Sequence, residues 1–274
     1  IAAGMIGSRE GWREAPYLSI PIAVDQIGST LSTVRTRAGQ VIHIVPGLIQ
    51  NSALPDVIRG EETQVIGALG MLDFDKDSSR AEQPDEQDEV LIGLPGTHSK
   101  WVQVRRQHRE MESRIEHFST FMTGDVYAAL CAHTILARGM QASEVSRSDH
   151  GAFDRGVLVA QTPAGRAGVL STIFSTRTLG LTGVLDAAGQ REYLSGLLIG
   201  HEVAALQILL TKQRHQFPRV ILIGDAALCE RYVRVLKAYG IDQVEVAEQA
   251  TERGLWQLAL AAGLLTRIST ITKE

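Results

Sequence analysis

The pattern of hydrophobic and polar positions is most regular downstream of residue 90, where short β-rich runs give way to longer helical ones. Runs rich in β-branched or alternating apolar residues predict strands, and they cover residues 90–94, 100–106, 113–121, 219–223 and 243–246. Apolar residues at helical spacing predict helices, the first capped by Thr123 or Asp125, and they cover residues 124–137, 149–162, 168–180, 189–212, 226–238 and 249–265.

With the helical stretch of residues 149–180 set aside, the order of these elements is β-β-β-α-β-α-β-α. Three antiparallel strands followed by alternating helices and strands form the ribonuclease-H-like arrangement, a mixed sheet covered by helices. The segment 73–89 is rich in acidic residues and nearly free of aliphatic ones, which indicates a solvated surface loop. We therefore expect an α/β protein in which residues 90–274 form a ribonuclease-H-like domain, with residues 1–89 as a separate upstream domain.

Composition narrows the class of protein. A chain of 274 residues, 44% apolar and 21% charged, is typical of a globular protein with a buried core. Its formal net charge of −4 argues against nucleic acid as the main partner. The two cysteines, Cys131 and Cys229, form no CxxC motif, which disfavours a disulfide or zinc framework and fits a reducing cytoplasm. The longest apolar run we identify, residues 255–265, is about half of the ~20 residues that span a bilayer, so we expect no membrane partner.

The most informative segment is LIGLPGTHSKWVQV, residues 91–104. It predicts two short strands joined by a Pro-Gly bend that carries two hydroxyl side chains and a cation, Thr97, Ser99 and Lys100. Backbone amides in such a bend can surround an anion, and the side chains add further donors. The segment therefore indicates a phosphate-binding loop, and the alternative is an ordinary hairpin turn that uses Pro and Gly for their backbone angles.

No GxxxxGK[ST], GxGxxG or G-x-S-x-G motif is found, and the eight histidines form no HExxH, so P-loop, Rossmann, α/β-hydrolase and catalytic-zinc interpretations lack support. The glycine-rich stretch GMIGSREGW, residues 4–12, holds Ser8, Arg9 and Trp12 and suits a small polar ligand. The alternative is a plain surface loop.

A second stretch, VIRGEETQVIG, covers residues 57–67 and leads through Arg59 and Gly60 into a predicted helix. The first turn of that helix holds Glu61 and Glu62. Acidic side chains at this end of a helix are favoured by its dipole, which is the simpler interpretation. A carboxylate fixed at a helix start can also serve as a general base toward a hydroxyl group.

Two further segments lie near the end of the chain. The apolar strand predicted in VILIGDAAL, residues 220–228, ends at Gly224 and Asp225, and the carboxyl end of a strand is a usual ligand site in α/β sheets. The segment EQATERGLWQLALAA, residues 248–262, predicts a core helix in which Gly254 allows close helix contact.

Taken together, these motifs resemble those of 2-keto-3-deoxygalactonate kinases (2-dehydro-3-deoxygalactonokinases), along nearly the whole chain. The matching segments are GMIGSREGW with APYLSIP, IRGEETQVIGA, LPGTHSKWVQV, TFMTGDVYAAL and YLSGLLIGHEVA. The resemblance implies the fold of the actin, sugar-kinase and heat-shock ATPase superfamily: two ribonuclease-H-like domains with an ATP and substrate cleft between them, of which the N-terminal one, residues 1–89, would be incomplete in this chain. It also implies ATP-dependent phosphorylation of the C6 hydroxyl of 2-dehydro-3-deoxy-D-galactonate, a step in galactonate breakdown. Such kinases begin with a strand and an Asp-x-Gly-Thr-type loop, and we expect about sixty such residues to be missing before Ile1.

The resemblance also implies roles for the candidate residues. Glu61 is the expected base, with Glu62 as the alternative. ATP phosphates would meet Gly96, Thr97, His98 and Ser99, and adenosine would meet Gly224, Asp225, Gly200 and Glu202. Mg²⁺ would arrive with ATP and keep most of its water, needing few protein ligands. The sugar acid would lie against Ser8 and Trp12, its carboxylate held by Arg9, Arg59 or Lys100, which we leave unranked.

Two other functions stay open at this point. One keeps the fold and phosphorylates a different sugar acid or a polyol. The other is a non-catalytic sugar sensor, although we find no basic helix-turn-helix segment of the kind that a regulator would carry. The sequence leaves the oligomeric state undetermined, with a homodimer as one option.

Overall fold

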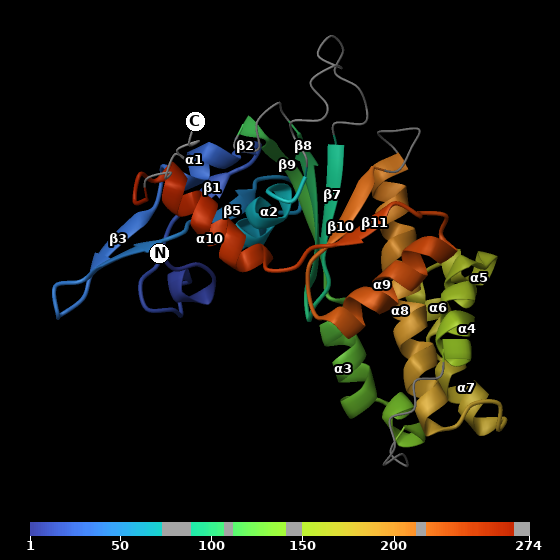
Figure 1. The fold of residues 1–274 in the computed structure, drawn as a ribbon. Coiled ribbons are helices and arrows are strands. Elements are labelled where there is room, and N and C mark those ends of the chain that lie inside the picture. The colour runs from blue at the N-terminus through green and yellow to red at the C-terminus, as the bar shows by residue number, and fades with distance from the viewer. Residues whose placement is uncertain (73–88, 107–111, 141–149, 212–217, 266–274) are drawn as a thin grey trace, which may run out of the picture.

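The computed structural model describes residues 1–72, 89–106, 112–140, 150–211 and 218–265 of the chain, and it shows a mixed α/β fold built around one large sheet (Figure 1). In spatial order, the six strands of this sheet are β11 (Val244–Val246), β10 (Arg219–Leu222), β7 (Glu89–Leu94), β8 (Ser99–Arg105), β9 (Arg114–Phe121) and β2 (Ile22–Ala23). β7, β8, β9 and β2 pair antiparallel, whereas β7, β10 and β11 pair parallel. The predicted strands are therefore confirmed, each with a shift of no more than one residue at either end.

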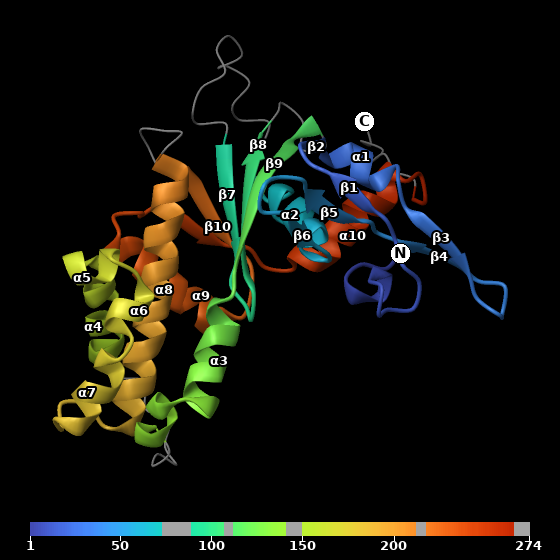
Figure 2. The ribbon, with the colours of Figure 1, turned by 180° about the vertical axis from the view of Figure 1, so that it is seen from behind.

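The core lies on both faces of this sheet, because alternate residues of the central strands point to opposite sides. Val90 and Ile92 of β7 join one buried cluster, while Leu91 between them joins another. Helices α2 (Glu61–Leu69), α1 (Val24–Gly28) and α10 (Ala250–Ala261) cover the first face. Helices α8 (Ala187–Thr211), α9 (Ala226–Ala238) and α4 (His150–Gln161) cover the second, as Figure 2 shows from behind. Burial on both faces explains why β7 reads as an uninterrupted apolar run.

Helices α2 and α10 pack unusually closely, although the chain separates them by about 180 residues. Each presents a glycine at the contact. A side chain on Gly67 would overlap the carbonyl of Ala250, and one on Gly254 would overlap the carbonyl of Thr63. The prediction that Gly254 permits close helix contact is confirmed. Because α10 packs on α2 and β2 joins the large sheet, the upstream and downstream segments share a core. The division of the chain into two domains between residues 89 and 90 stays a prediction.

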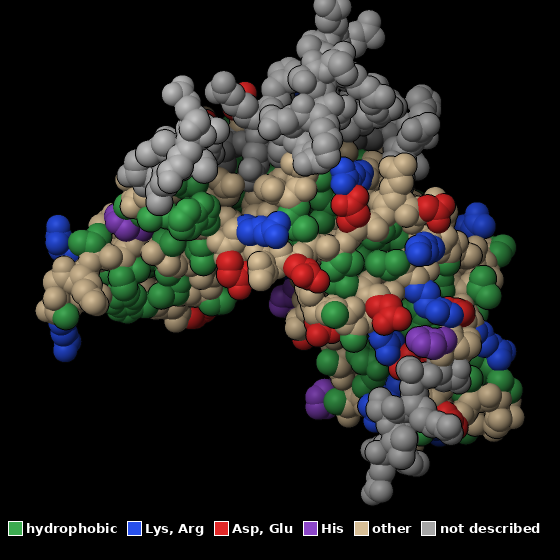
Figure 3. Space-filling model, in the orientation of Figure 1, with side chains coloured by type: hydrophobic (Ala, Val, Ile, Leu, Met, Phe, Trp, Pro, Cys, Tyr) green, Lys and Arg blue, Asp and Glu red, His purple; other side chains and the backbone are tan. Residues whose placement is uncertain are grey.

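The upstream segment adds two small sheets beside the large one. β1 (Tyr17–Ser19), β5 (Gly47–Gln50) and β6 (Asp56–Ile58) form one, and the hairpin of β3 (Ser32–Arg35) and β4 (Val41–Ile44) forms the other. The predicted acidic loop falls almost wholly outside the described residues, and Glu89 at its end already belongs to β7. In the space-filling view the molecule is hollowed between the part that carries α10 and the part that carries α3 (Thr123–His133) (Figure 3).

Two predicted helices differ from the structure for local reasons. The helix expected over residues 124–137 is α3 followed by a 3-10 turn, Ile135–Gly139. Neither Thr123 nor Asp125 caps it: Met122 holds the cap position, and the Thr123 hydroxyl donates to the carboxylate of Glu202 instead. The helix expected over residues 168–180 is two short helices, α6 (Val169–Thr172) and α7 (Ser175–Leu181), and a further short helix, α5 (Pro163–Arg166), precedes them. Pro163 opens α5, and Gly168, at φ 117°, separates α5 from α6.

Helix α8, which the sequence predicted, is apolar enough to be compared with a membrane-spanning helix. An 18-residue stretch within Ala187–Leu210 has a mean hydropathy of 1.5, so length and composition alone would allow a span. However, 61% of that stretch is buried within the protein. Its apolar character therefore matches that of a core helix, which crosses the second face of the sheet.

Candidate active site

The loop between β7 and β8 is exposed at its tip and supported from behind by α3. Thr97 and His98 face solvent, and Gly96 is half-buried. The backbone N–H of Asp125, in the first turn of α3, donates to the carbonyl of Thr97 at 3.0 Å. The Asp125 carboxylate lies 3.3 Å from Nε2 of His98. The tip thus offers backbone amides and the Thr97 hydroxyl beside the amino end of a helix, an arrangement suited to an anion.

Ser99 behaves differently from the loop tip. It is the first residue of β8, is fully buried, and has its hydroxyl 2.8 Å from the hydroxyl of Tyr232 on α9. This burial is evidence against the predicted contact between the Ser99 side chain and phosphate. Since strand residues alternate between the two faces of a sheet, Ser99 points into the core that α9 covers.

The end of β10 lies beside the same loop. The N–H of Ile223 donates to the carbonyl of Gly93 at 2.9 Å. A side chain on Gly224 would lie 3.2 Å from the carbonyl oxygen of Pro95. Gly224 and Asp225 are both exposed, and the Asp225 side chain accepts a hydrogen bond from the N–H of Leu228 and so caps α9. The structure therefore brings this predicted pair next to the phosphate-like loop.

Glu61 is the first residue of α2, and its side chain lies beside Lys100, which follows the loop between β7 and β8. Its Oε2 accepts a hydrogen bond of 2.8 Å from the N–H of Arg59, and its Oε1 lies 3.7 Å from Nζ of Lys100. The Lys100 ammonium also donates to the carbonyl of His98 at 3.3 Å. The Glu61 side chain keeps 26% of its exposure, whereas that of Lys100 keeps 7%. One lysine thus joins the start of α2 to the loop, with the carboxylate still open to solvent.

Glu62, the alternative base, is fully buried. Its Oε2 accepts from the N–H of Gly60 at 2.6 Å, and its Oε1 accepts from the hydroxyl of Thr63 at 3.1 Å. Burial raises the pKa of Glu62 from 4.5 to about 7, with a smaller upward contribution from the charge of Glu61, while the hydrogen bonds act in the opposite direction. A base must lie within hydrogen-bond reach of its proton, so accessibility favours Glu61 over Glu62.

The glycine-rich loop lies beside the start of α2. Gly60 has φ 109°, and a side chain there would meet the Cα of Gly4 at 3.0 Å. Arg9 and Trp12 of this loop are exposed, whereas Ser8 is buried with a hydroxyl that has no hydrogen-bond partner in the described part of the chain. The loop that carries the predicted sugar-acid residues is therefore brought next to the start of α2, although Ser8 does not face solvent.

Arg59 pins the chain that follows this loop. Its Nη2 donates to the carbonyl of Ala15 at 2.9 Å, its Nε donates to the hydroxyl of Tyr17 at 3.3 Å, and its guanidinium lies 4.1 Å from the centre of the Tyr17 ring. Its Nη1 is buried and has no hydrogen-bond partner among the described residues, and it lies 3.1 Å from where a side chain on Gly7 would begin. Of the three predicted cations, Arg59 and Lys100 thus have protein partners, and Arg9 is exposed.

Gly200 and Glu202 are not brought to the loop tip. Gly200 is buried where α8 crosses α4, and its carbonyl accepts from the hydroxyl of Tyr239 at 2.8 Å. The Glu202 carboxylate is buried and accepts hydrogen bonds from Trp101, Thr123 and Tyr232. The burial of both residues, Gly200 against α4 and Glu202 among its hydrogen-bond donors, is evidence against the predicted contact to adenosine. Sequence reasoning missed Trp101, Thr123 and Tyr232, which hold this carboxylate.

Metal-binding residues are sparse near the loop. Within the described residues, no three His, Cys, Asp or Glu side chains gather closely enough to hold a metal ion. Asp125, half exposed beside His98, is a carboxylate in a suitable place at the loop. A single carboxylate fits Mg²⁺, which usually binds through one or two carboxylates together with nucleotide phosphates and water.

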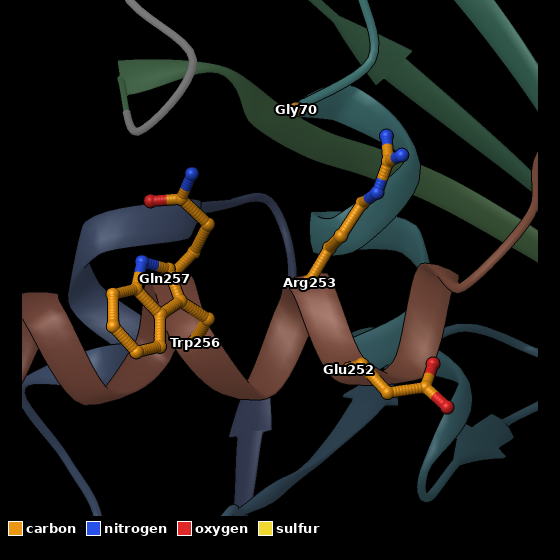
Figure 4. A pocket seen from close by; sticks show the side chains of 5 residues that line it. All are labelled: Gly70, Glu252, Arg253, Trp256 and Gln257. Carbon is orange, nitrogen blue, oxygen red and sulfur yellow. The ribbon is translucent and has the colours of Figure 1, made fainter.

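A separate surface pocket lies on the outer side of α10, away from the loop. Its lining comes from α10 and from the residue after α2, and Figure 4 shows its members, Gly70, Glu252, Arg253, Trp256 and Gln257. Trp256 is 57% exposed, on the opposite side of α10 from the buried Gly254 and Leu258. The pocket contains none of the residues that the sequence analysis assigned to a site.

A loop for anions that faces an open carboxylate is typical of enzymes that move a phosphate group onto a hydroxyl. The model of the 2-keto-3-deoxy-galactonokinase family matches residues 1–258, and the chain belongs to this family. It is similar to the 2-dehydro-3-deoxygalactonokinase of Escherichia coli (strain K12), with 35% identity over 264 residues, 95% of this chain and 78% of that protein. A crystal structure of a candidate 2-dehydro-3-deoxygalactonokinase from Sinorhizobium meliloti has 32% identity and a TM-score of 0.80, covering 96% of this chain and 79% of its own.

Proposed function

We propose that the protein is a kinase that transfers the γ-phosphate of ATP to the C6 hydroxyl of 2-dehydro-3-deoxy-D-galactonate, giving 2-dehydro-3-deoxy-6-phospho-D-galactonate and ADP in galactonate catabolism. Membership of the 2-keto-3-deoxy-galactonokinase family supports the activity. The observation that carries the site is the contact between Glu61 and Lys100, 3.7 Å apart, which joins the start of α2 to the loop after β7.

On the nucleotide side, the tip of the loop would receive the phosphates. The amides of Gly96, Thr97 and His98 and the hydroxyl of Thr97 are the donors, and the amino end of α3 behind them adds a favourable dipole. Gly224 and Asp225 at the end of β10 would border the adenosine. Asp125 is the residue that we assign to a magnesium ion, which neutralises phosphate charge when it is bound.

On the acceptor side, Glu61 would act as the general base. Its carboxylate takes the proton of the C6 hydroxyl as that oxygen forms a bond to the γ-phosphorus, and the bond from this phosphorus to the bridging oxygen of ADP breaks. Lys100 holds the carboxylate beside the loop and supplies positive charge near the transferred group. The separation of Glu62 from solvent supports Glu61 in this role.

Arg9 is our choice for the cation that binds the carboxylate of the sugar acid. It is exposed on the glycine-rich loop, whereas Arg59 and Lys100 are held by protein partners. Trp12 is exposed on the same loop and offers an apolar face to the carbon chain. Arg59 would act indirectly, by fixing the chain around Ala15 and Tyr17 that carries this loop.

We further propose that residues 90–274 form a ribonuclease-H-like nucleotide-binding domain and residues 1–89 a substrate-binding domain. The strand order β9-β8-β7-β10-β11, with three antiparallel strands followed by two parallel ones, supports the first assignment. In this division α10 returns from the downstream domain to pack on α2. The free cysteines Cys131 and Cys229 support a reducing, cytoplasmic environment.

A coupled assay that follows ADP release across a panel of sugar acids and polyols tests the proposed function. We expect the highest kcat/KM for 2-dehydro-3-deoxy-D-galactonate, and phosphorus NMR of the product should show a phosphate ester on C6. A higher kcat/KM for another acceptor would reassign the substrate. ATP-dependent turnover of none of the panel would contradict the assignment as a kinase.

A further inference from the structure

We propose that Glu202 is a positioning residue of the phosphate-binding loop: from the core it fixes the root of the loop and the start of α3 as one unit. This inference rests on the proposed kinase function, because the loop matters here as the site for ATP phosphates. It gives Glu202 a role different from the adenosine contact expected from the sequence. Glu202 touches no substrate in this proposal and acts through its neighbours.

The Glu202 carboxylate is the meeting point of four elements. It projects from α8 and is 3% exposed. Its Oε1 accepts a hydrogen bond of 2.7 Å from Nε1 of Trp101 on β8. Its Oε2 accepts from the hydroxyl of Tyr232 on α9 at 2.8 Å, and also from the hydroxyl of Thr123, the first residue of α3.

The network continues to the loop itself. The hydroxyl of Tyr232 lies 2.8 Å from that of Ser99, where the loop ends and β8 begins. On the other side, the N–H of Asp125 donates to the carbonyl of Thr97, and a side chain on Gly124 would lie 2.5 Å from the carbonyl of Gly96. Ser99 and Thr123, both tied to Glu202, therefore lie on the two sides of the loop tip. A shift at either point would move the amides of residues 96–98.

Stability alone gives little reason for a carboxylate at this position. Burying a charged group is costly, and a buried polar network often stabilises no more than apolar residues of the same shape would. Burial raises the pKa of Glu202, and hydrogen bonding with Thr123, Trp101, Tyr232 and Ser99 opposes that rise. What the network does supply is a fixed geometry, and a preorganised set of donors binds an anion without having to rearrange.

Two tyrosines allow a matched comparison. Tyr232→Phe removes the hydroxyl that joins Glu202 to Ser99. Tyr193→Phe removes the hydroxyl of a side chain on α8 that is as deeply buried overall, whose partner is Ser175 at 2.6 Å and not the loop or Glu202. Thr123→Val and Thr123→Ser form a second pair, since only the serine keeps a hydroxyl for the carboxylate. Glu202→Gln is less suitable, because its amide nitrogen would replace the oxygen that accepts from both Thr123 and Tyr232 and would reverse both hydrogen bonds at once.

The readouts are the KM values for ATP and for the sugar acid, together with deuterium exchange of the ligand-free protein over residues 96–101 and 122–127. We expect Tyr232→Phe and Thr123→Val to raise the KM for ATP about tenfold. This corresponds to the loss of one buried hydrogen bond that holds the loop in its binding geometry. The KM for the sugar acid should stay within about twofold. Tyr193→Phe and Thr123→Ser should match the wild type in both constants. Exchange should be faster in the first two variants only.

Equal KM values for ATP in Tyr232→Phe and Tyr193→Phe would overturn the inference, as would a parallel rise of both KM values. If the wild type proved not to phosphorylate the sugar acid, the proposed function would fail and exchange would decide the inference alone. Faster exchange at the loop and the start of α3 in Tyr232→Phe, but not in Tyr193→Phe, would still support it, and equal exchange would overturn it. If Tyr232→Phe did not fold, the two Thr123 variants would decide in the same way.

Discussion

The pH dependence of folding should depend strongly on Glu62. Its carboxyl group is fully buried, and its pKa in the folded protein is about 7 against an ordinary 4.5. Between these two pH values the folded state holds a proton that the unfolded state has released. The free energy of unfolding should therefore fall as the pH rises from 4.5 to 7 and then level off. A shift of this size corresponds to about 3 kcal/mol at pH 8.

Glu62→Gln removes this titration while it keeps the shape of the side chain and one acceptor for the N–H of Gly60. We expect the free energy of unfolding of the variant, minus that of the wild type, to increase by about 3 kcal/mol between roughly pH 4.5 and pH 8, so the variant gains stability relative to the wild type. Urea denaturation followed by circular dichroism at four or five pH values measures it. Glu248→Gln, the same change at an exposed position before α10, serves as the control and should show no such trend.

A difference between Glu62→Gln and the wild type that stayed constant across this pH range would refute the reasoning. It would mean that the Glu62 carboxylate is solvated in the folded protein or is compensated by a positive charge. The packing of α2 against the sheet and α10 would then have to be looser than the buried cluster around Val65 and Ile66 indicates.

Three further predictions concern packing and binding. Gly254→Ala should destabilise the protein by about 1–3 kcal/mol in urea denaturation, because the added methyl group would overlap the carbonyl of Thr63. An unchanged midpoint would contradict the close packing of α2 and α10. Thr97→Val should raise the KM for ATP and Arg9→Ala the KM for the sugar acid, and equal effects of both changes on both substrates would contradict the two-sided site. Lys100→Met should lower turnover, because it leaves the Glu61 carboxylate without its cation; normal turnover would show that the contact has no role in catalysis.

Much of the fold could be predicted from the sequence because its central strands carry strong local signals. The run around Val90 is apolar enough to be a strand buried on both faces, and the Pro-Gly bend before Thr97 marks its end. The helix expected over residues 168–180 was harder to place. Its apolar pattern continues through residues 173 and 174, where α6 has ended and α7 has not yet begun.

The candidate site could be predicted only as far as its exposed loops. The burial of Ser99 and Glu202 depends on partners that are distant in the sequence, above all Tyr232. No local sequence pattern predicts these partners. A signal was nevertheless present at Glu202, a lone carboxylate within the apolar run of α8. Since a buried charge must be paired or hydrogen-bonded, such a position predicts a polar network rather than a ligand contact. The same reasoning applies to Glu62 among the apolar residues of α2.

The most direct test of the account compares Glu61→Gln with Glu62→Gln in the phosphorylation of 2-dehydro-3-deoxy-D-galactonate, with ATP affinity measured separately by calorimetry. If Glu61 is the base, Glu61→Gln should lower kcat by a factor on the order of a hundred or more while the Kd for ATP stays nearly unchanged. Glu62→Gln should remain within an order of magnitude of the wild type. Turnover close to that of the wild type in Glu61→Gln, or the larger loss in Glu62→Gln, would contradict the assignment of the base and with it the placement of the acceptor beside Lys100.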